Sequence, residues 1–176
     1  MEFICPDPKA LVRAANVRAT LDAFLLVPSQ GERLIARHRL DVKDLTPDKF
    51  VPVQRWLDAL KEIQQQVGVG VVRHVGSRII ENADFPPQYS TVEAILTNLD
   101  EIYHLNHRGE VGHYHCDRTD GALVVRCETP YPRHFEWGLV EGICRNKAAG
   151  GRSYATTYVE GPPMGNLTCT VTVRAK

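Results

Sequence analysis

The chain has no excess of charge of either sign, and this balance argues against strongly charged partners. Its 176 residues include 21 lysines and arginines and 21 aspartates and glutamates. The sequence contains no basic run interleaved with aromatic residues, the pattern that is typical of nucleic-acid binding. It also contains no apolar stretch near the ~20 residues that a membrane-spanning helix needs. We therefore expect a protein that binds no nucleic acid and has no membrane span.

The cysteines give no indication of disulfide bonds. The five cysteines are odd in number, scattered, and form no Cys-x-x-Cys pair. That pattern is typical of reduced thiols in a reducing compartment. The first residues lack the charged and apolar regions of a secretory signal peptide. We therefore expect a cytoplasmic protein.

The first part of the chain, residues 1–107, has the apolar spacing of helices. Pro8 can begin one helix, and residues 31–40 suit another. Thr46-Pro47 offers an N-cap and a first-turn proline to a third helix, which Pro52 restarts after a kink. A helical lobe is therefore predicted.

Two further helices are predicted before residue 107. Gly68 and Gly70 end the helix that Pro52 restarts, and apolar residues return with helical period over 71–80. Ser90 then stands three residues before Glu93, as in a capping box. The apolar residues behind it that indicate one continuous helix are Val92, Ile95, Leu96, Leu99 and Ile102.

The second part, residues 108–176, alternates strand and helix patterns. The expected elements are a strand at 111–117, a turn at 118–121, a strand at 122–128, a helix at 135–144, a strand at 153–159, a loop at 161–165 and a strand at 167–173. Gly138 and Gly142 lie one turn apart and predict a smooth strip where this helix lies close to the sheet. The expected fold class is α+β, a helical lobe followed by a four-stranded antiparallel sheet (ββαββ).

Three segments, one at the end of the helical first part and two in the second part, resemble a known superfamily. They are Asn98-Leu99-Asp100-Glu101-Ile102-Tyr103, Gly121-Ala122-Leu123-Val124-Val125 and Thr129-Pro130-Tyr131-Pro132. Together with the element order, they resemble the H-NOX/4-vinyl-reductase-like superfamily, whose fold occurs in NO signalling and in a Golgi vesicle-tethering complex. The resemblance implies an H-NOX-like fold and one ligand-binding domain over residues 1–176.

The resemblance also implies that the usual heme motifs are missing. Tyr103 takes the position of the proximal heme histidine, and His104, one residue later, is turned by ~100° on the helix. Where the family has a Tyr-x-Ser-x-Arg clamp for heme propionates, this chain reads Arg126-Cys127-Glu128-Thr129-Pro130. We therefore expect no cofactor. A heme or other tetrapyrrole held by His104 is the alternative.

Large aromatic residues are the candidates for a ligand site between helical lobe and sheet. Core packing is the simpler interpretation of such residues, and lining a cleft is the functional one. The predicted ligand-binding residues are Trp56, Tyr103, His104, Tyr131, Phe135 and Trp137.

His113-Tyr114-His115-Cys116 suggests a metal site at first sight. Alternation along a strand places His113 and His115 on one face and Cys116 on the other. Cys127 from the partner strand could complete a set with the two histidines. A polar strand face is the simpler interpretation, so we predict no metal and keep these residues as weak candidates.

The resulting interpretation is a sensory or carrier domain that holds a small, mostly apolar or aromatic ligand. Such a domain needs a separate output protein, and a homodimer is plausible by analogy with related folds. One alternative is a structural or assembly protein similar to the vesicle-tethering subunits. Another is an enzyme acting on a tetrapyrrole vinyl group, although the sequence shows no nicotinamide or flavin site.

Overall fold

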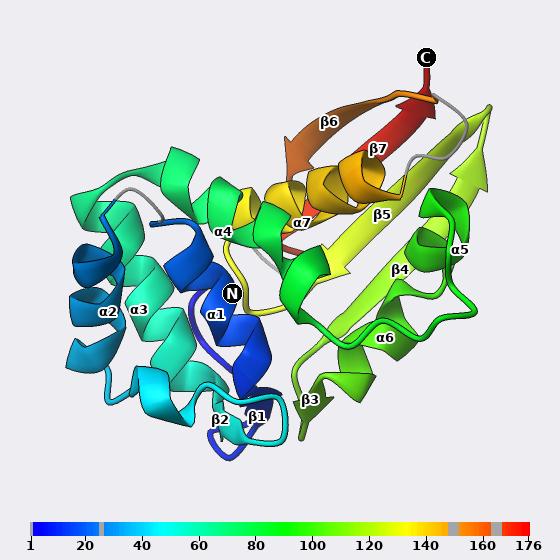
Figure 1. Ribbon diagram of the computed structural model, residues 1–176. Coiled ribbons are helices and arrows are strands. Elements are labelled where there is room, and N and C mark those ends of the chain that lie inside the picture. The colour runs from blue at the N-terminus through cyan, green and yellow to red at the C-terminus, as the bar shows by residue number, and fades with distance from the viewer. Residues whose placement is uncertain (1, 25–26, 148–151, 163–166) are drawn as a thin grey trace.

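Helices occupy the first half of the chain and an antiparallel sheet dominates the second, which confirms the expected α+β class (Figure 1). The computed structural model describes residues 2–24, 27–147, 152–162 and 167–176. The helices are α1 (Ala14–Asp22), α2 (Pro28–Arg37), the 3-10 helix Val42–Asp44, α3 (Val53–Gln66), α4 (Val69–Asn82), α5 (Val92–Thr97), α6 (Leu99–Leu105) and α7 (Arg133–Asn146). The strands are β1 (Leu11–Arg13), β2 (Phe50–Pro52), β3 (His107–Arg108), β4 (His113–Thr119), β5 (Ala122–Glu128), β6 (Tyr154–Glu160) and β7 (Cys169–Ala175).

The larger sheet has the strand order β4-β5-β7-β6, and all of its neighbouring strands are antiparallel. A tight turn joins β4 to β5, and both Asp120 (φ 46°) and Gly121 (φ 72°) have the left-handed conformation that such a hairpin requires. On β7, Cys169, Val171 and Val173 are buried and face the core, while Thr170 and Thr172 between them are partly exposed. Most of the predicted 161–165 loop lies outside the described residues.

Helices α4 and α7 cross at very short range beside the sheet. A Cβ atom on Gly76 would lie 2.0 Å from the carbonyl oxygen of Phe135, and one on Gly138 would lie 1.9 Å from that of Arg73. Gly142 meets the carbonyl oxygen of Ser77 in the same way. The predicted smooth strip on α7 therefore exists but faces α4 and not the sheet, because both helices carry glycine at the crossing.

A second, three-stranded sheet in the order β2-β1-β3 was not expected. The prediction of a helix from Pro8 is wrong at residues 11–13, which form β1, and no helix starts at Thr46-Pro47. Pairing with distant segments overrides the local pattern here. Leu11 lies opposite both Pro52 and Arg108 in the sheet.

The continuous helix expected behind the capping box is divided at Asn98 into α5 and α6. The Asn98 side chain donates a hydrogen bond to the Ala94 carbonyl at 2.8 Å, which lets the chain turn between the two helices. The N-cap is Thr91, whose Oγ1 accepts from the Ala94 N–H at 3.1 Å, so the predicted cap at Ser90 is one residue early. In the described part of the chain, every helix is too short or too polar to cross a membrane.

Because of the α4–α7 crossing, we expect alanine to lower the unfolding free energy far more at Gly138 than at Gly70. Gly138→Ala should destabilise the protein by about 3 kcal/mol, because the added methyl group overlaps the backbone of α4. Chemical denaturation followed by circular dichroism measures the change.

Gly70→Ala is the matched control. Gly70 also lies in a helix, but a Cβ there meets no described atom within 4 Å. Alanine at this position should be neutral or stabilising by up to about 1 kcal/mol. Equal effects of the two substitutions would contradict the assigned crossing.

Candidate functional site

A cavity of about 40 Å³ lies where the helical lobe meets the sheet. Its walls come from α1, α3, α4, α6, β3, β4 and α7 and from the segments after α4 and before α7. The lining residues are Asn16, Trp56, Ile79, Ala83, Phe85, Leu99, Ile102, Tyr103, Asn106, His107, Tyr114, Tyr131, Phe135 and Leu139. Both lobes therefore contribute to one small, mostly apolar space.

Several aromatic rings pack against one another at this junction. Trp56 on α3 meets Tyr131 and Phe135 edge-on, with ring centroids 5.3 and 5.5 Å apart, and the last two rings stack at 4.8 Å. Tyr103 on α6 lies 6.3 Å from Tyr131. The sequence named these four among its ligand candidates, and the structure brings them together around the cavity. Edge-on and stacked contacts of this kind stabilise the packing by about 0.5–1.5 kcal/mol each, beyond the burial of apolar area.

His107 is the imidazole that lines the cavity, and both of its nitrogens are engaged. Nδ1 lies 2.7 Å from the Tyr103 carbonyl oxygen, which can only accept, so Nδ1 carries the proton. Nε2 then accepts from the Tyr131 hydroxyl at 2.8 Å. Burial lowers the pKa of His107 to about 4, which keeps the ring neutral.

A buried carboxyl, Glu136, lies in the first turn of α7 and was not identified from the sequence. It accepts hydrogen bonds from the Tyr114 hydroxyl at 2.6 Å and from the Thr129 hydroxyl. Burial raises its pKa to about 7, although both hydrogen bonds act in the opposite direction. Helical spacing could have found it, because Glu136 precedes the buried Val140 and Ile143 by four and seven positions.

Asn16 on α1 is the unusual polar residue of the cavity wall. Its side chain is buried, and its amide oxygen has no hydrogen-bond partner among the described residues. By contrast, Asn106 in the same wall bonds the backbone of Asp84 and Ile102. An unsatisfied buried acceptor costs about 1–3 kcal/mol, so the Asn16 amide is a marked exception.

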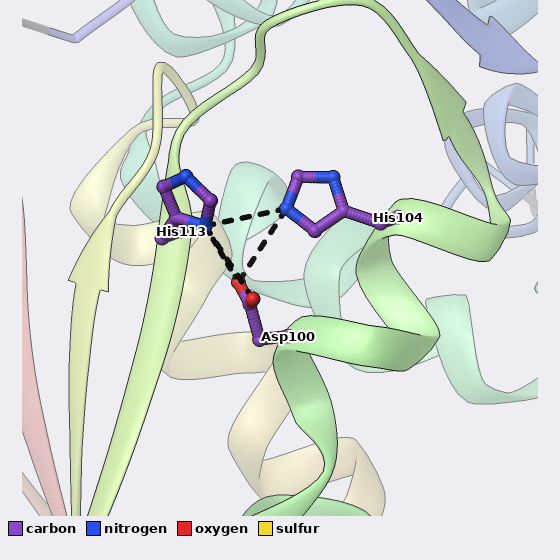
Figure 2. Close-up of side chains that lie close together, drawn as sticks. All are labelled: Asp100, His104 and His113. Carbon is purple, nitrogen blue, oxygen red and sulfur yellow. Dashed lines mark hydrogen bonds and ion pairs between the residues drawn. The ribbon is translucent and has the colours of Figure 1, made fainter.

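Trp137 and His104 lie away from the cavity. Trp137 stacks on Tyr158 of β6 at 4.5 Å, and the guanidinium of Arg73 lies 3.4 Å from its ring centroid. His104 leaves α6 on the side facing β4, where it meets Asp100 and His113 (Figure 2). The predicted placement of both residues in the ligand site therefore does not match the structure.

The weak metal set of His113, His115 and Cys127 is not assembled either. In the β4–β5 register, His113 lies opposite Glu128 and Tyr114 lies opposite Cys127. Cys127 is fully buried on the core side, whereas both histidines are exposed. Alternation along the strands separates them. His113 instead forms a cluster with His104 and Asp100, whose ligand atoms lie within 4.8 Å of one another.

Comparison with known proteins identifies the architecture. No protein-family model matches the chain, and no curated protein matches it by sequence. A mutant H-NOX structure from T. tengcongensis superimposes with a TM-score of 0.69 at 12% identity, covering 93% of this chain and 97% of the other. The chain has the H-NOX fold. A mutant H-NOX domain from Shewanella oneidensis in the Fe(II)CO ligation state gives a TM-score of 0.66 at 10% identity over 91% and 96% of the two chains.

Another matching structure is described as modulating heme redox potential through protein-induced porphyrin distortion. It superimposes with a TM-score of 0.64 at 13% identity, over 92% of this chain and 96% of the other. The question is therefore whether the residues around the cavity of this chain fit a heme. The cavity of about 40 Å³ is far smaller than the roughly 300–1,000 Å³ of ordinary cofactor sites. Its imidazole, His107, has no free nitrogen, and no described lysine or arginine lines it to pair with propionates. As arranged, these residues do not fit a heme.

The buried carboxyl predicts a specific pH dependence of stability. Glu136 has a higher pKa in the folded protein (about 7) than the ordinary 4.5. Its stabilising contribution is therefore complete below pH 4.5 and is lost as the pH rises through 7. Gln does not ionise, so the Glu136→Gln variant avoids this loss. The unfolding free energy of the variant minus that of wild type should therefore rise by about 3 kcal/mol between pH 4 and pH 8.

Urea denaturation at several pH values measures this difference. His107 has the opposite effect, since its low pKa makes stability rise with pH between about 4 and 6.5. Wild type and Glu136→Gln both contain His107, so its contribution cancels when the two proteins are compared. Glu32→Gln, at an exposed position of α2, controls for the loss of one negative charge. Parallel stability curves for wild type and Glu136→Gln would refute the assignment.

Proposed function

We propose that this protein is a small-molecule sensor or carrier that works without heme and holds a mostly apolar ligand in the central cavity. The observation that carries the proposal is the buried Asn16 amide oxygen, which has no partner on the wall of an otherwise apolar, aromatic space. A hydrogen-bond donor on a ligand would satisfy this acceptor. The ligand class is therefore a compact apolar molecule with one hydroxyl or N–H group.

The size of the cavity argues that binding moves the two lobes. A dry apolar cavity of about 150 Å³ accommodates benzene, whereas this one measures about 40 Å³. A ring-sized ligand enters only if the helices bearing Trp56 and Tyr103 move away from the segment bearing Tyr131 and Phe135. Ligand affinity and lobe arrangement are then coupled, because the ligand favours the more open of two states.

A separate output protein would read this change, and we include that class of partner in the proposal. Self-association through the helical faces and a cytoplasmic location stay predictions from the sequence. A structural or assembly role, as in the vesicle-tethering subunits, does not explain why the buried Asn16 amide oxygen lacks a hydrogen-bond partner among the described residues. An enzymatic role has no supporting arrangement of groups among the described residues of the cavity wall.

Phenol and toluene are matched probes for this site, because they share a ring and differ by one hydrogen-bond donor. Wild-type protein should bind phenol more tightly than toluene. At a concentration about a hundredfold above the dissociation constant, phenol should raise the unfolding free energy by about 2.7 kcal/mol. Thermal shift and amide chemical-shift perturbation measure binding and its location.

Two variants separate binding in the cavity from binding elsewhere. Asn16→Leu should abolish the preference for phenol and, by removing an unsatisfied acceptor, stabilise the free protein by about 1 kcal/mol. Ala83→Leu adds bulk to the cavity wall and should abolish binding of both probes.

Ala36→Leu makes the same change at an exposed position of α2 and should bind as wild type. No saturable binding by wild type, or equal binding by wild type and Ala83→Leu, would refute the proposal.

A further inference from the structure

We propose that Asp100, His104 and His113 form a binding site for one divalent transition-metal ion of the zinc class. Figure 2 shows the three side chains converging from α6 and from the start of β4. His104 Nε2 lies 3.3 Å from His113 Nδ1 and 3.6 Å from Asp100 Oδ1, and His113 Nδ1 lies 3.3 Å from the same oxygen. This site is separate from the cavity and does not depend on the function proposed for it.

The three distances match the geometry that zinc prefers. Zinc binds imidazole nitrogen and carboxylate oxygen at about 2.0–2.1 Å, almost always as a tetrahedron. Ligand atoms at the corners of such a tetrahedron are about 3.3–3.4 Å apart, whereas neighbouring ligands of an octahedron at the same bond length are about 2.9 Å apart. The observed edges of 3.3, 3.3 and 3.6 Å form one face of the tetrahedron.

The surroundings hold these ligands in place before any ion arrives. Asp100 and His104 are one helical turn apart and therefore share a face of α6. Asp100 Oδ1 also accepts the Tyr114 backbone N–H at 2.8 Å, which fixes the carboxylate against β4. The outer nitrogen of His113, Nε2, lies 4.0 Å from Glu110 Oε1. That distance is too long for a hydrogen bond, so Asp100 is the ligand that the surroundings fix in place.

The donor set indicates the class of ion. Two imidazoles with one carboxylate suit zinc, nickel or copper, whereas magnesium and calcium prefer oxygen ligands alone. The side chains of Asp100, His104 and His113 are 40%, 38% and 49% exposed, so an ion can enter from solvent. Water would take the fourth corner of the tetrahedron.

Metal binding here would join α6 to β4. The same short helix carries Ile102 and Tyr103 into the wall of the cavity. An ion held by His113 on one side and by Asp100 and His104 on the other therefore fixes the position of that wall. The bound ion would therefore link the helical lobe to the sheet and stabilise their relative position.

Zinc titration of tag-free, chelator-treated protein tests the proposal, because the imidazoles of a purification tag bind the same ions. Competition with a chromophoric chelator should give one zinc per chain, and thermal unfolding should shift upward with saturation. Cobalt(II) should give the intense visible absorption of a tetrahedral complex. His104→Ala and His113→Ala should each lose the saturable binding.

His115→Ala is the matched control. It removes an exposed histidine from the same face of β4, two residues from His113 and outside the cluster. It should bind zinc as wild type does. Absence of one-to-one binding by wild type, or equal weakening by His115→Ala and His113→Ala, would overturn the proposal and leave a pair of histidines hydrogen-bonded with a carboxylate.

Discussion

The close crossing of α4 and α7 is the contact on which the rest of this molecule depends. Carbonyl oxygens of each helix occupy the space that a side chain would take on the other, at Gly76, Gly138 and Gly142. Because the two backbones approach so closely, the first turn of α7 is drawn into the junction between lobes. That turn brings Phe135 to the cavity wall and places Glu136 in the core.

Burial favours the uncharged forms of the titratable groups at this junction. It lowers the pKa of His107 to about 4, which keeps the ring neutral, and raises the pKa of Glu136 to about 7, so this carboxyl is protonated below neutral pH. Their hydrogen bonds run to Tyr131, Tyr114 and other core groups. A satisfied network of this kind specifies one arrangement of the aromatic rings. The unsatisfied amide of Asn16 stands out against that background.

Helix α6 links the two sites because successive residues point in different directions. Tyr103 faces the cavity, and His104, ~100° further around the helix, faces β4 and His113. Helical geometry predicts that the side chains of Tyr103 and His104 point in different directions, and the structure has them so, although the sequence also named His104 as a ligand-binding residue. The proposed ligand and the proposed ion would therefore act on the same helix, from two different sides.

The sequence by itself determined the features that depend on neighbours along the chain: the α+β class, the β4–β5 hairpin around Asp120, and helices such as α3 and α7, because their periods are local. Only the tertiary structure decided which distant segments meet. Strand β1 formed because Leu11 pairs with Pro52 and Arg108, and His113 was matched with α6 and not with Cys127. Register and helix crossing are set by packing between elements, and a local pattern contains no information about them.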